Sequence, residues 1–360
     1  MPTRDGIAGA PTFDDSVAPL LPLLRCAVCA SRDRLSVETG LIKADIRIQL
    51  HDEHLVCSGC RTQYPISADM IPIMWDVDVQ RVFSRSHDSD AESLGALGAN
   101  IAIYDSISDD YILYSRGQAV VRQKMQSAAS KAIPAAQGPR GYHLDFGCGP
   151  GHVMEWLKDL EFRQIGLDIS LNNLRNARRL RGCLVVCGNA CNMPFADETM
   201  DLVTESSALH HILHWQSAVK EALRICKRPG GVVLDAEPTK AQMALSPLAV
   251  RVFNARFRVY QLLSYFMREK YVFRDVVQAR LNVQAEIHHQ PGTGFPLPEI
   301  ELLFEHAGFD VDIVLSPSAD AVEQANPNWK EILLSVLSAR NPWNPEYGNF
   351  TAIGRAPARA

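Results

Sequence analysis

The chain has 360 residues, which is enough for two or three domains with their own hydrophobic cores. Hydrophobic residues make up 47%, charged residues 21%, and the formal net charge is −5, so no global excess of positive charge points to nucleic acid. No long uninterrupted apolar run predicts a transmembrane helix, and the N-terminus lacks the basic and apolar layout of a signal peptide. We therefore expect a cytoplasmic protein, with a flexible N-terminus over residues 1–18.

Two pairs of cysteines follow this N-terminus, and each pair has the spacing C-x2-C. The four residues are Cys26, Cys29, Cys57 and Cys60. Two such knuckles, separated by a segment that alternates as strands do, suit a tetrahedral, all-thiolate zinc site. A pair of disulfides or idle thiols is the alternative, and disulfides are disfavoured in a chain without an export signal. We predict a zinc-binding, β-rich region over residues 19–80, and four thiolates leave no open position, so the zinc should be structural.

This region resembles a known kind of zinc ribbon. The runs 55–66 and 70–73 are similar to the small zinc-ribbon activators of tRNA, rRNA and release-factor methyltransferases, and a family of rRNA guanine methyltransferases also carries such a ribbon at its N-terminus. The resemblance raises RNA binding as an alternative. Through residue 90, however, nine Lys and Arg stand against thirteen Asp and Glu, whereas an RNA-binding face should be basic. The ribbon is then a scaffold packed on the rest of the chain, or a wall beside the substrate.

Residues 86–98 are rich in Ser, Asp, Gly and Ala and predict a linker. After it, Tyr104 and Tyr111 flank a predicted helical turn. We assign residues 86–135 to this linker and to N-terminal helices, and residues 136–356 to the main domain. Two interpretations of this turn are open. It belongs to a surface helix that buries two aromatic rings, or it forms a lid, as the family resemblance described below implies.

The main domain opens with an apolar strand that runs into three glycines at alternate positions, Gly147, Gly149 and Gly151. Glycine permits positive φ and close approach of a ligand to the backbone. A strand, a glycine turn and a helix form the first unit of a nucleotide-binding α/β fold. A dinucleotide site would need a third glycine at position 152, where His152 stands. The pattern present is an acid, Asp145, followed by glycines at every second position.

The sequence features that follow occur in the order typical of one protein family. A second strand ends in Asp168, Ser170 suits a helix N-cap, a third strand ends before Asn189, and a fourth and a fifth strand follow over 200–205 and 232–235. In this order, over residues 100–240, the sequence resembles the class I S-adenosylmethionine-dependent methyltransferases of the ubiquinone-type ("type 11") branch. The resemblance implies an α/β, Rossmann-like sheet of seven strands, the last one antiparallel, with a helical cap insertion.

The resemblance also implies S-adenosylmethionine as the cofactor. A carboxylate at the tip of the second strand, Asp168, can accept both ribose hydroxyls, and a tyrosine of the N-terminal lid covers the methionine end. The implied cofactor-binding residues are Tyr104, Asp145, Gly147, Cys148, Gly149, Gly151, Asp168, Ile169, Asn189, Ala190 and Ser206.

At Asn189 the sequence departs from this family, which usually has an aspartate that accepts from the adenine amino group. The side-chain carbonyl of Asn189 can still accept one hydrogen bond. The departure keeps adenine recognition but removes a charge, so Asn189→Asp is expected to bind the cofactor at least as well.

Three histidines after the fourth strand, His210, His211 and His214, are candidates for a general base. A base is needed only when the methyl acceptor must lose a proton. We take His210 and His211 as the catalytic candidates, against the alternative that they cap a helix or pack beside the cofactor. No Asn-Pro-Pro-aromatic motif follows the fourth strand, where residues 205–208 stand, and this disfavours an amino group of a nucleobase or a glutamine as the target.

An insertion over residues 240–290 follows the fifth strand and is predicted to form the cap. Its stretch 251–280 interleaves aromatic residues with seven Lys and Arg against two Asp and Glu. This composition suits a pocket for an acidic acceptor, a helix at a membrane surface that meets a lipid-soluble acceptor, or a packed cap with a solvated basic face. The segments 311–315 and 349–353 predict the last two strands.

The sequence predicts a methyltransferase that acts on an O, N or C atom of a small molecule. The alternatives are an RNA methyltransferase that uses the ribbon for recognition and a non-catalytic cofactor-binding protein. The acceptor atom and the oligomeric state do not follow from the sequence.

Overall fold

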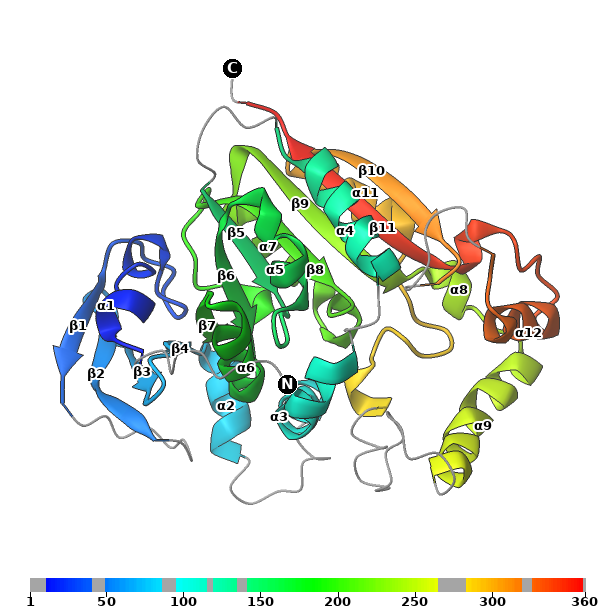
Figure 1. Ribbon diagram of the computed structural model, residues 1–360, viewed down its shortest axis with the longest axis horizontal. Helices are drawn as coiled ribbons and strands as arrows, with labels where there is room; N and C mark the ends of the chain where they lie inside the picture. Colours follow the sequence, from blue (N-terminus) through cyan, green and yellow to red (C-terminus); the bar gives the residue numbers. More distant parts are fainter. Residues whose placement is uncertain are drawn as a thin grey trace, which may run out of the picture.

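The computed structural model describes residues 11–40, 49–85, 95–114, 119–134, 141–264, 283–318 and 326–358. It contains two β-sheets, one of three strands and one of eight (Figure 1). Most of the aromatic and basic stretch 251–280 lies outside the described residues or their described side chains. Among the helices that the structure describes, none is long and apolar enough to cross a membrane.

The larger sheet has the strand order β10-β11-β9-β8-β5-β6-β7-β4. Its strands are β4 (Ile73–Met74), β5 (Tyr142–Phe146), β6 (Arg163–Asp168), β7 (Leu184–Gly188), β8 (Met200–Ser206), β9 (Cys226–Pro238), β10 (Asp310–Ser316) and β11 (Asn349–Ala356). All neighbours pair in parallel except β11, which is antiparallel to both β9 and β10. The predicted α/β sheet with an antiparallel last strand is confirmed.

The chain reverses its direction of travel across this sheet at β5. From β5 it moves outward to β6 and β7, then returns to β8 on the other side of β5. In open α/β sheets, ligands bind at such a switch point, outside the carboxyl ends of the strands. The fold therefore points to the loops that follow β5, β6 and β8.

Helices cover both faces of the sheet because strand residues alternate between them. In β8, Leu202 packs against α4 (Ala119–Ala132) and α5 (His152–Trp156), whereas Val203 belongs to the cluster that holds α7 (Trp215–Ile225) and α11 (Leu297–His306). The helix α6 (Leu171–Arg181) covers β7 on the same face as α5. Its N-cap is Ser170, whose hydroxyl accepts a hydrogen bond from the backbone of Asn173, as the sequence predicts.

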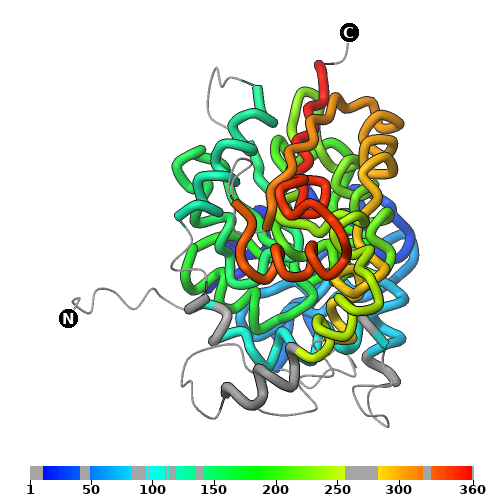
Figure 2. Tube along the Cα trace, turned by 90° about the vertical axis from the view of Figure 1, so that its right-hand side faces the viewer, coloured from blue at the N-terminus to red at the C-terminus, as the bar shows by residue number. Residues whose placement is uncertain are grey.

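The sequence predicts seven strands in this sheet, and the structure adds an eighth from the N-terminal part of the chain. We call the described residues 11–40 and 49–85 the N-terminal module. It contains α1 (Phe13–Ser16), the 3-10 turn η1 (Leu21–Leu23), the antiparallel sheet β1 (Leu35–Thr39), β2 (Leu50–Cys57) and β3 (Gln63–Ser67), then β4 and α2 (Val77–Arg85). Figures 1 and 2 place this module and the C-terminal elements at opposite ends of the larger sheet.

Two boundaries differ from the prediction. Within the segment 1–18 that we expected to be flexible, residues 13–16 form α1 and Val17 is fully buried in the main hydrophobic cluster. Within the predicted linker, residues 95–98 begin the helix α3 (Gly95–Tyr114). In both places a few apolar side chains find a partner surface far away in the sequence, which composition does not reveal. At the other end of the molecule, the cap helix α9 (Pro247–Ser264) lies beside α12 (Trp329–Leu337).

Candidate functional site

The glycine turn after β5 has the backbone that its sequence demands. Gly147, Gly149 and Gly151 all have positive φ, at 64°, 52° and 84°. A Cβ added to Gly147 would lie 2.4 Å from the Cβ of Ala208, so this position also lacks room for a side chain. The turn therefore presents bare backbone at the switch point, beside the start of α5.

The predicted ribose carboxylate, Asp168, is tied to this turn. One carboxylate oxygen accepts from the backbone N–H of Gly149 and the other from that of Ser170, each at 2.8 Å. Burial raises the pKa of Asp168 from 3.8 to about 6, although these backbone hydrogen bonds oppose the shift. A carboxylate offers about four lone-pair sites, and because the side chain of Asn173 also hydrogen-bonds to Asp168, only part of them is left for a ligand.

The other predicted cofactor residues surround this carboxylate to differing degrees. Asp145 is buried and accepts from the hydroxyl of Thr204 at 2.8 Å, and burial raises its pKa well above the ordinary value. The side chain of Cys148 is buried beneath the turn. The hydroxyl of Ser206 donates to Asp235 at 3.2 Å, on the β9 side. Ile169 and Ala190 are partly buried and pack against the clusters around β7.

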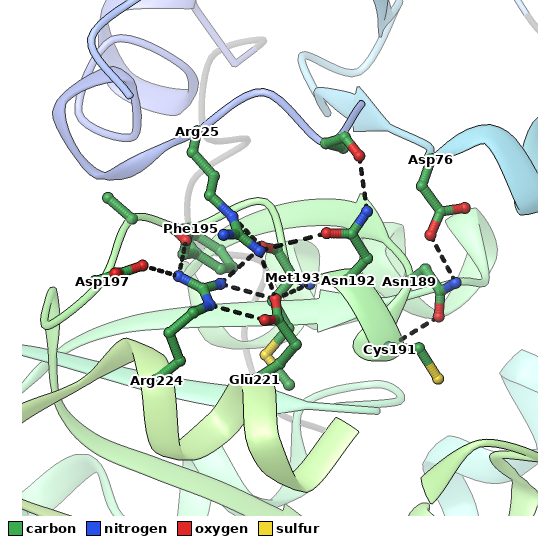
Figure 3. A network of polar contacts seen from close by, with 12 residues as sticks. Arg25, Asp76, Asn189, Cys191, Asn192, Met193, Phe195, Asp197, Glu221 and Arg224 are labelled. Atoms are coloured by element: carbon green, nitrogen blue, oxygen red, sulfur yellow. Dashed lines mark hydrogen bonds and ion pairs between the residues drawn. The ribbon is translucent and has the colours of Figure 1, made fainter. Parts of the chain in front are cut away.

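Asn189 follows β7, and both ends of its side chain are occupied. Its carbonyl oxygen accepts from the backbone N–H of Cys191, and its amide nitrogen donates to a carboxylate oxygen of Asp76, both at 2.9 Å. Asp76 belongs to the N-terminal module (Figure 3). This contact brings together two residues that lie 113 positions apart in the sequence.

The lid residue Tyr104 lies on α3 and reaches the histidines after β8. Its hydroxyl is 2.7 Å from Nε2 of His211, whose Nδ1 is 3.0 Å from the carbonyl oxygen of Ala285. The amide of Asn100, also on α3, donates to the carbonyl of His211 at 2.8 Å. Both ring nitrogens of His211 are therefore engaged. The side chain of Tyr111, its predicted companion, lies outside the described side chains.

His210 is held differently, by a buried carboxylate. Its Nδ1 is 2.9 Å from Glu237 at the end of β9, and Nε2 makes no hydrogen bond to any residue that the structure describes. Burial lowers the pKa of His210 to about 3 and raises that of Glu237 to about 8. Glu205 lies against Glu237, and burial raises its pKa well above the ordinary value. When Glu237 is ionised, the Nδ1–H of His210 donates to it, and Nε2 is the ring nitrogen without a partner among the described residues.

The four predicted metal ligands come together in the N-terminal module. The sulfur atoms of Cys26, Cys29, Cys57 and Cys60 all lie within 4.8 Å of one another. Cys26 and Cys60 are 3.5 Å apart, and Cys29 and Cys57 are 3.7 Å apart. A tetrahedral zinc with Zn–S bonds of about 2.3 Å requires sulfur separations of about 3.8 Å. None of the nine cysteines, all in described ranges, forms a disulfide, so the donor set fits a closed zinc site.

The sequence analysis missed two acids, Asp76 and Glu237. Glu237 could have been noticed, since it ends a parallel strand at the edge of the sheet where ligands bind. Asp76 carries no such signal, because only the pairing of β4 with β7 brings it to Asn189.

Comparisons with known proteins agree with this geometry. Residues 144–234 match a family model described as "Methyltransferase domain". A demethylmenaquinone methyltransferase of Thermobifida fusca is 34% identical over 140 residues, which are 37% of this chain and 58% of the relative. A protein of the same name from Renibacterium salmoninarum is 30% identical over 153 residues, 42% of this chain and 61% of the relative. The chain thus spans about three fifths of these relatives.

Among solved structures, a SAM-dependent methyltransferase from Thermotoga maritima is similar with a TM-score of 0.42 and 19% identity, over 71% of this chain and 98% of that one. The segment matched by the family model contains the glycine turn, Asp168 and Asn189. Several of the residues that the fold gathers at its switch point therefore lie within the segment that matches this family model.

Proposed function

We propose that the protein is an S-adenosylmethionine-dependent methyltransferase whose acceptor is a small molecule with a proton to lose. The observation that carries this proposal is the geometry of Asp168. A buried carboxylate, fixed by the N–H groups of Gly149 and Ser170, stands beside bare glycine backbone at the switch point of the sheet. A nucleoside with two ribose hydroxyls fits such an acceptor.

The cofactor, when bound, supplies a methyl group made electrophilic by its sulfonium. The chain then has to hold the acceptor in line, exclude water and, where needed, remove a proton. We assign proton removal to Nε2 of His210. Glu237 accepts from Nδ1, which fixes the ring and leaves the lone pair on Nε2. His211, whose two nitrogens are engaged by Tyr104 and Ala285, is assigned to holding the lid helix α3.

For the acceptor, we propose a lipid-soluble molecule that carries a hydroxyl group or an acidic C–H group. Relatives named demethylmenaquinone methyltransferase support this choice. The helices at the cap end support it too, since Leu248 on α9 and Trp329, Leu333 and Val336 on α12 are exposed. The chain keeps these apolar side chains at the surface where a lipid-soluble molecule would approach.

For the N-terminal module, we propose one structural zinc held by the four cysteines. The predicted units, residues 19–80 and residues 136–356, would then each have their own centre, a metal in one and a cofactor in the other. Four sulfur ligands close the coordination sphere, so the metal takes no part in the transfer.

Calorimetry with S-adenosylhomocysteine and a methyl-transfer assay test the proposal together. The wild type should bind S-adenosylhomocysteine. Asp168→Ala should bind it at least about tenfold more weakly, since hydrogen bonds to charged groups contribute about 1.5–3 kcal/mol each. Asp310→Ala, which alters an exposed acid, should bind it with the affinity of the wild type. Labelled methyl groups should then appear in a pool of quinols and phenols. Labelling of RNA alone would favour the RNA methyltransferase, and binding without any transfer would favour a non-catalytic protein.

A further inference from the structure

The N-terminal module meets the proposed methyltransferase domain along a polar seam made of two groups of contacts (Figure 3). Arg25 donates to Glu221 at 2.8 Å, and Glu221 also accepts from Arg224. Asn192 donates to the carbonyl of Ala27 at 2.7 Å. The seam ends at the contact between Asp76 and Asn189, which lies at the carboxyl end of β7.

Backbone pairing fixes the position of Asp76 at this seam. Met74 of β4 lies opposite Gly188 of β7, so the residues after each strand leave the sheet side by side. The indole N–H of Trp75 adds a contact to the sulfur of Cys187 at 3.3 Å. Asp76 then caps α2 by accepting from the backbone N–H of Val79 at 3.0 Å. The carboxylate is therefore held at one place, from two sides.

A buried acid at this place exceeds what a helix cap needs. Serine, threonine or asparagine caps a helix as well as aspartate does, whereas a buried carboxylate loses hydration. Asp76 is only 6% exposed. Its partner Asn189 stands where the resembling family has an acid, and the amide of Asn189 donates to Asp76 instead. The N-terminal module thus places a carboxylate at the carboxyl end of β7.

We propose that Asp76 completes the adenine end of the cofactor site. This inference rests on the proposed function, and it makes Asp76 a specificity-determining residue for a nucleoside with a 6-amino group. A carboxylate accepts from such an amino group and is repelled by a 6-oxo group, and two of its lone-pair sites remain after Val79 and Asn189 are counted. The N-terminal module is then a part of the cofactor site, and its docking sets the affinity for the cofactor.

The structure also changes the expectation for Asn189→Asp. Two carboxylates would stand where Asp76 and the amide of Asn189 now meet at 2.9 Å, and like charges at such a distance repel. The single substitution should therefore weaken cofactor binding. Combined with Asp76→Asn, it moves the charge to the other side of the same hydrogen bond and should restore binding.

Calorimetry of the full-length protein with S-adenosylhomocysteine and with its 6-oxo counterpart, S-inosylhomocysteine, tests this inference. Asp76→Asn keeps a good N-cap through its carbonyl oxygen, removes the charge, and gives up the hydrogen bond from the amide of Asn189. It should weaken binding of the adenine compound by roughly tenfold, because charge-assisted hydrogen bonds are the stronger ones. The ratio of the affinity for the adenine compound to the affinity for the inosine compound should therefore become smaller. The double variant Asp76→Asn/Asn189→Asp should recover that preference. The matched control, Asp78→Asn, alters an exposed acid of the same helix and should change neither value.

The outcomes separate this inference from the proposed function. A wild type that binds neither compound refutes the proposed function and this inference with it. A wild type that prefers the adenine compound, with the same preference in Asp76→Asn, refutes the role of Asp76 alone. Equal losses for both compounds in Asp76→Asn, without recovery in the double variant, would show a structural role only and would also overturn the inference.

Discussion

At the residue scale, the acids at the carboxyl ends of the strands of the larger sheet are buried, yet their proposed roles require the charged form. Burial raises the pKa of Asp168 to about 6, and ribose hydroxyls donate more strongly to its ionised form than to the neutral acid. Affinity for S-adenosylhomocysteine should therefore be constant above about pH 7 and fall as the pH drops through 6. Calorimetry between pH 5 and pH 8 measures this directly.

The variant Asp168→Asn provides the control for this pH dependence. Its affinity for S-adenosylhomocysteine should be low and independent of pH over the same range. Because a raised pKa means that ionisation of Asp168 destabilises the fold, the difference in urea midpoint between Asp168→Asn and the wild type should shift in favour of the variant as the pH rises from 5 to 8. If the wild type bound equally well at pH 5 and pH 8, the assignment of Asp168 to the ribose would be wrong.

The pair of His210 and Glu237 predicts a pH dependence of turnover in the same direction, centred at a higher pH. Burial raises the pKa of Glu237 to about 8, so below this pH the pair holds an additional proton and Nε2 of His210 is not free to accept one. The rate of methyl transfer should rise as the pH rises through about 8. His210→Gln should lower this rate by roughly 10²- to 10⁴-fold, the usual contribution of a general base, and leave the affinity for S-adenosylhomocysteine unchanged.

Two further variants locate this effect. Glu237→Gln should lower the rate of methyl transfer and abolish the rise of this rate near pH 8. The reason is that an amide does not titrate and no longer determines which nitrogen of His210 carries the proton. His306→Gln, at the exposed end of α11, should leave both the rate and its pH profile as in the wild type. A pH profile that survives in His210→Gln would assign the titration to another group.

Residues differ in how far the sequence reveals them. Asp168 and the three glycines could be predicted because local spacing within one strand and one turn defines them. The engagement of both nitrogens of His211 could not, since its partners Tyr104 and Ala285 lie 107 and 74 positions away.

At the element scale, the contact between the N-terminal module and α7 rests on an ion pair with little exposure. The side chains of Arg25 and Glu221 keep 13% and 15% of their surface exposed. Arg25→Met should lower the free energy of unfolding by about 1.5–3 kcal/mol, the range for hydrogen bonds to charged groups, as measured by urea denaturation. Arg32→Met, which alters an exposed pair, should change it by less than about 0.5 kcal/mol.

The same scale shows why most strands could be predicted and β4 could not. Strands β5 to β9 are buried, apolar runs bounded by turn residues, which is a strong local signal. In contrast, β4 has only two residues and no period of its own. It becomes a strand because Ile73 and Met74 meet the free edge of β7. The start of α3 and the helix α1 were not predicted for the same reason, because both depend on contacts with residues that are distant in the sequence.

At the scale of the whole molecule, metal binding and cofactor binding should be linked. A small module without its metal loses most of its folding free energy, and this module supplies both β4 and Asp76. Cys57→Ser should therefore lose the zinc in elemental analysis and bind S-adenosylhomocysteine more weakly. The sequence alone leaves the alternative that the ribbon is merely appended, in which case the affinity would not change. Cys183→Ser, outside the cysteine cluster, should keep both the metal and the affinity.

The position of β4 has a consequence for solubility as well. A strand at the edge of a sheet presents unpaired N–H and C=O groups, which can pair with another chain. β4 and the carbonyl of Pro72 cover the carboxyl end of β7, a strand of the sequence Leu-Val-Val-Cys-Gly. If loss of a zinc ion unfolds the module, the backbone of Cys187 and Gly188 loses this partner. A zinc at the four cysteines would thus protect the chain against edge-to-edge association, and a chelator should turn a clear solution into one that scatters light.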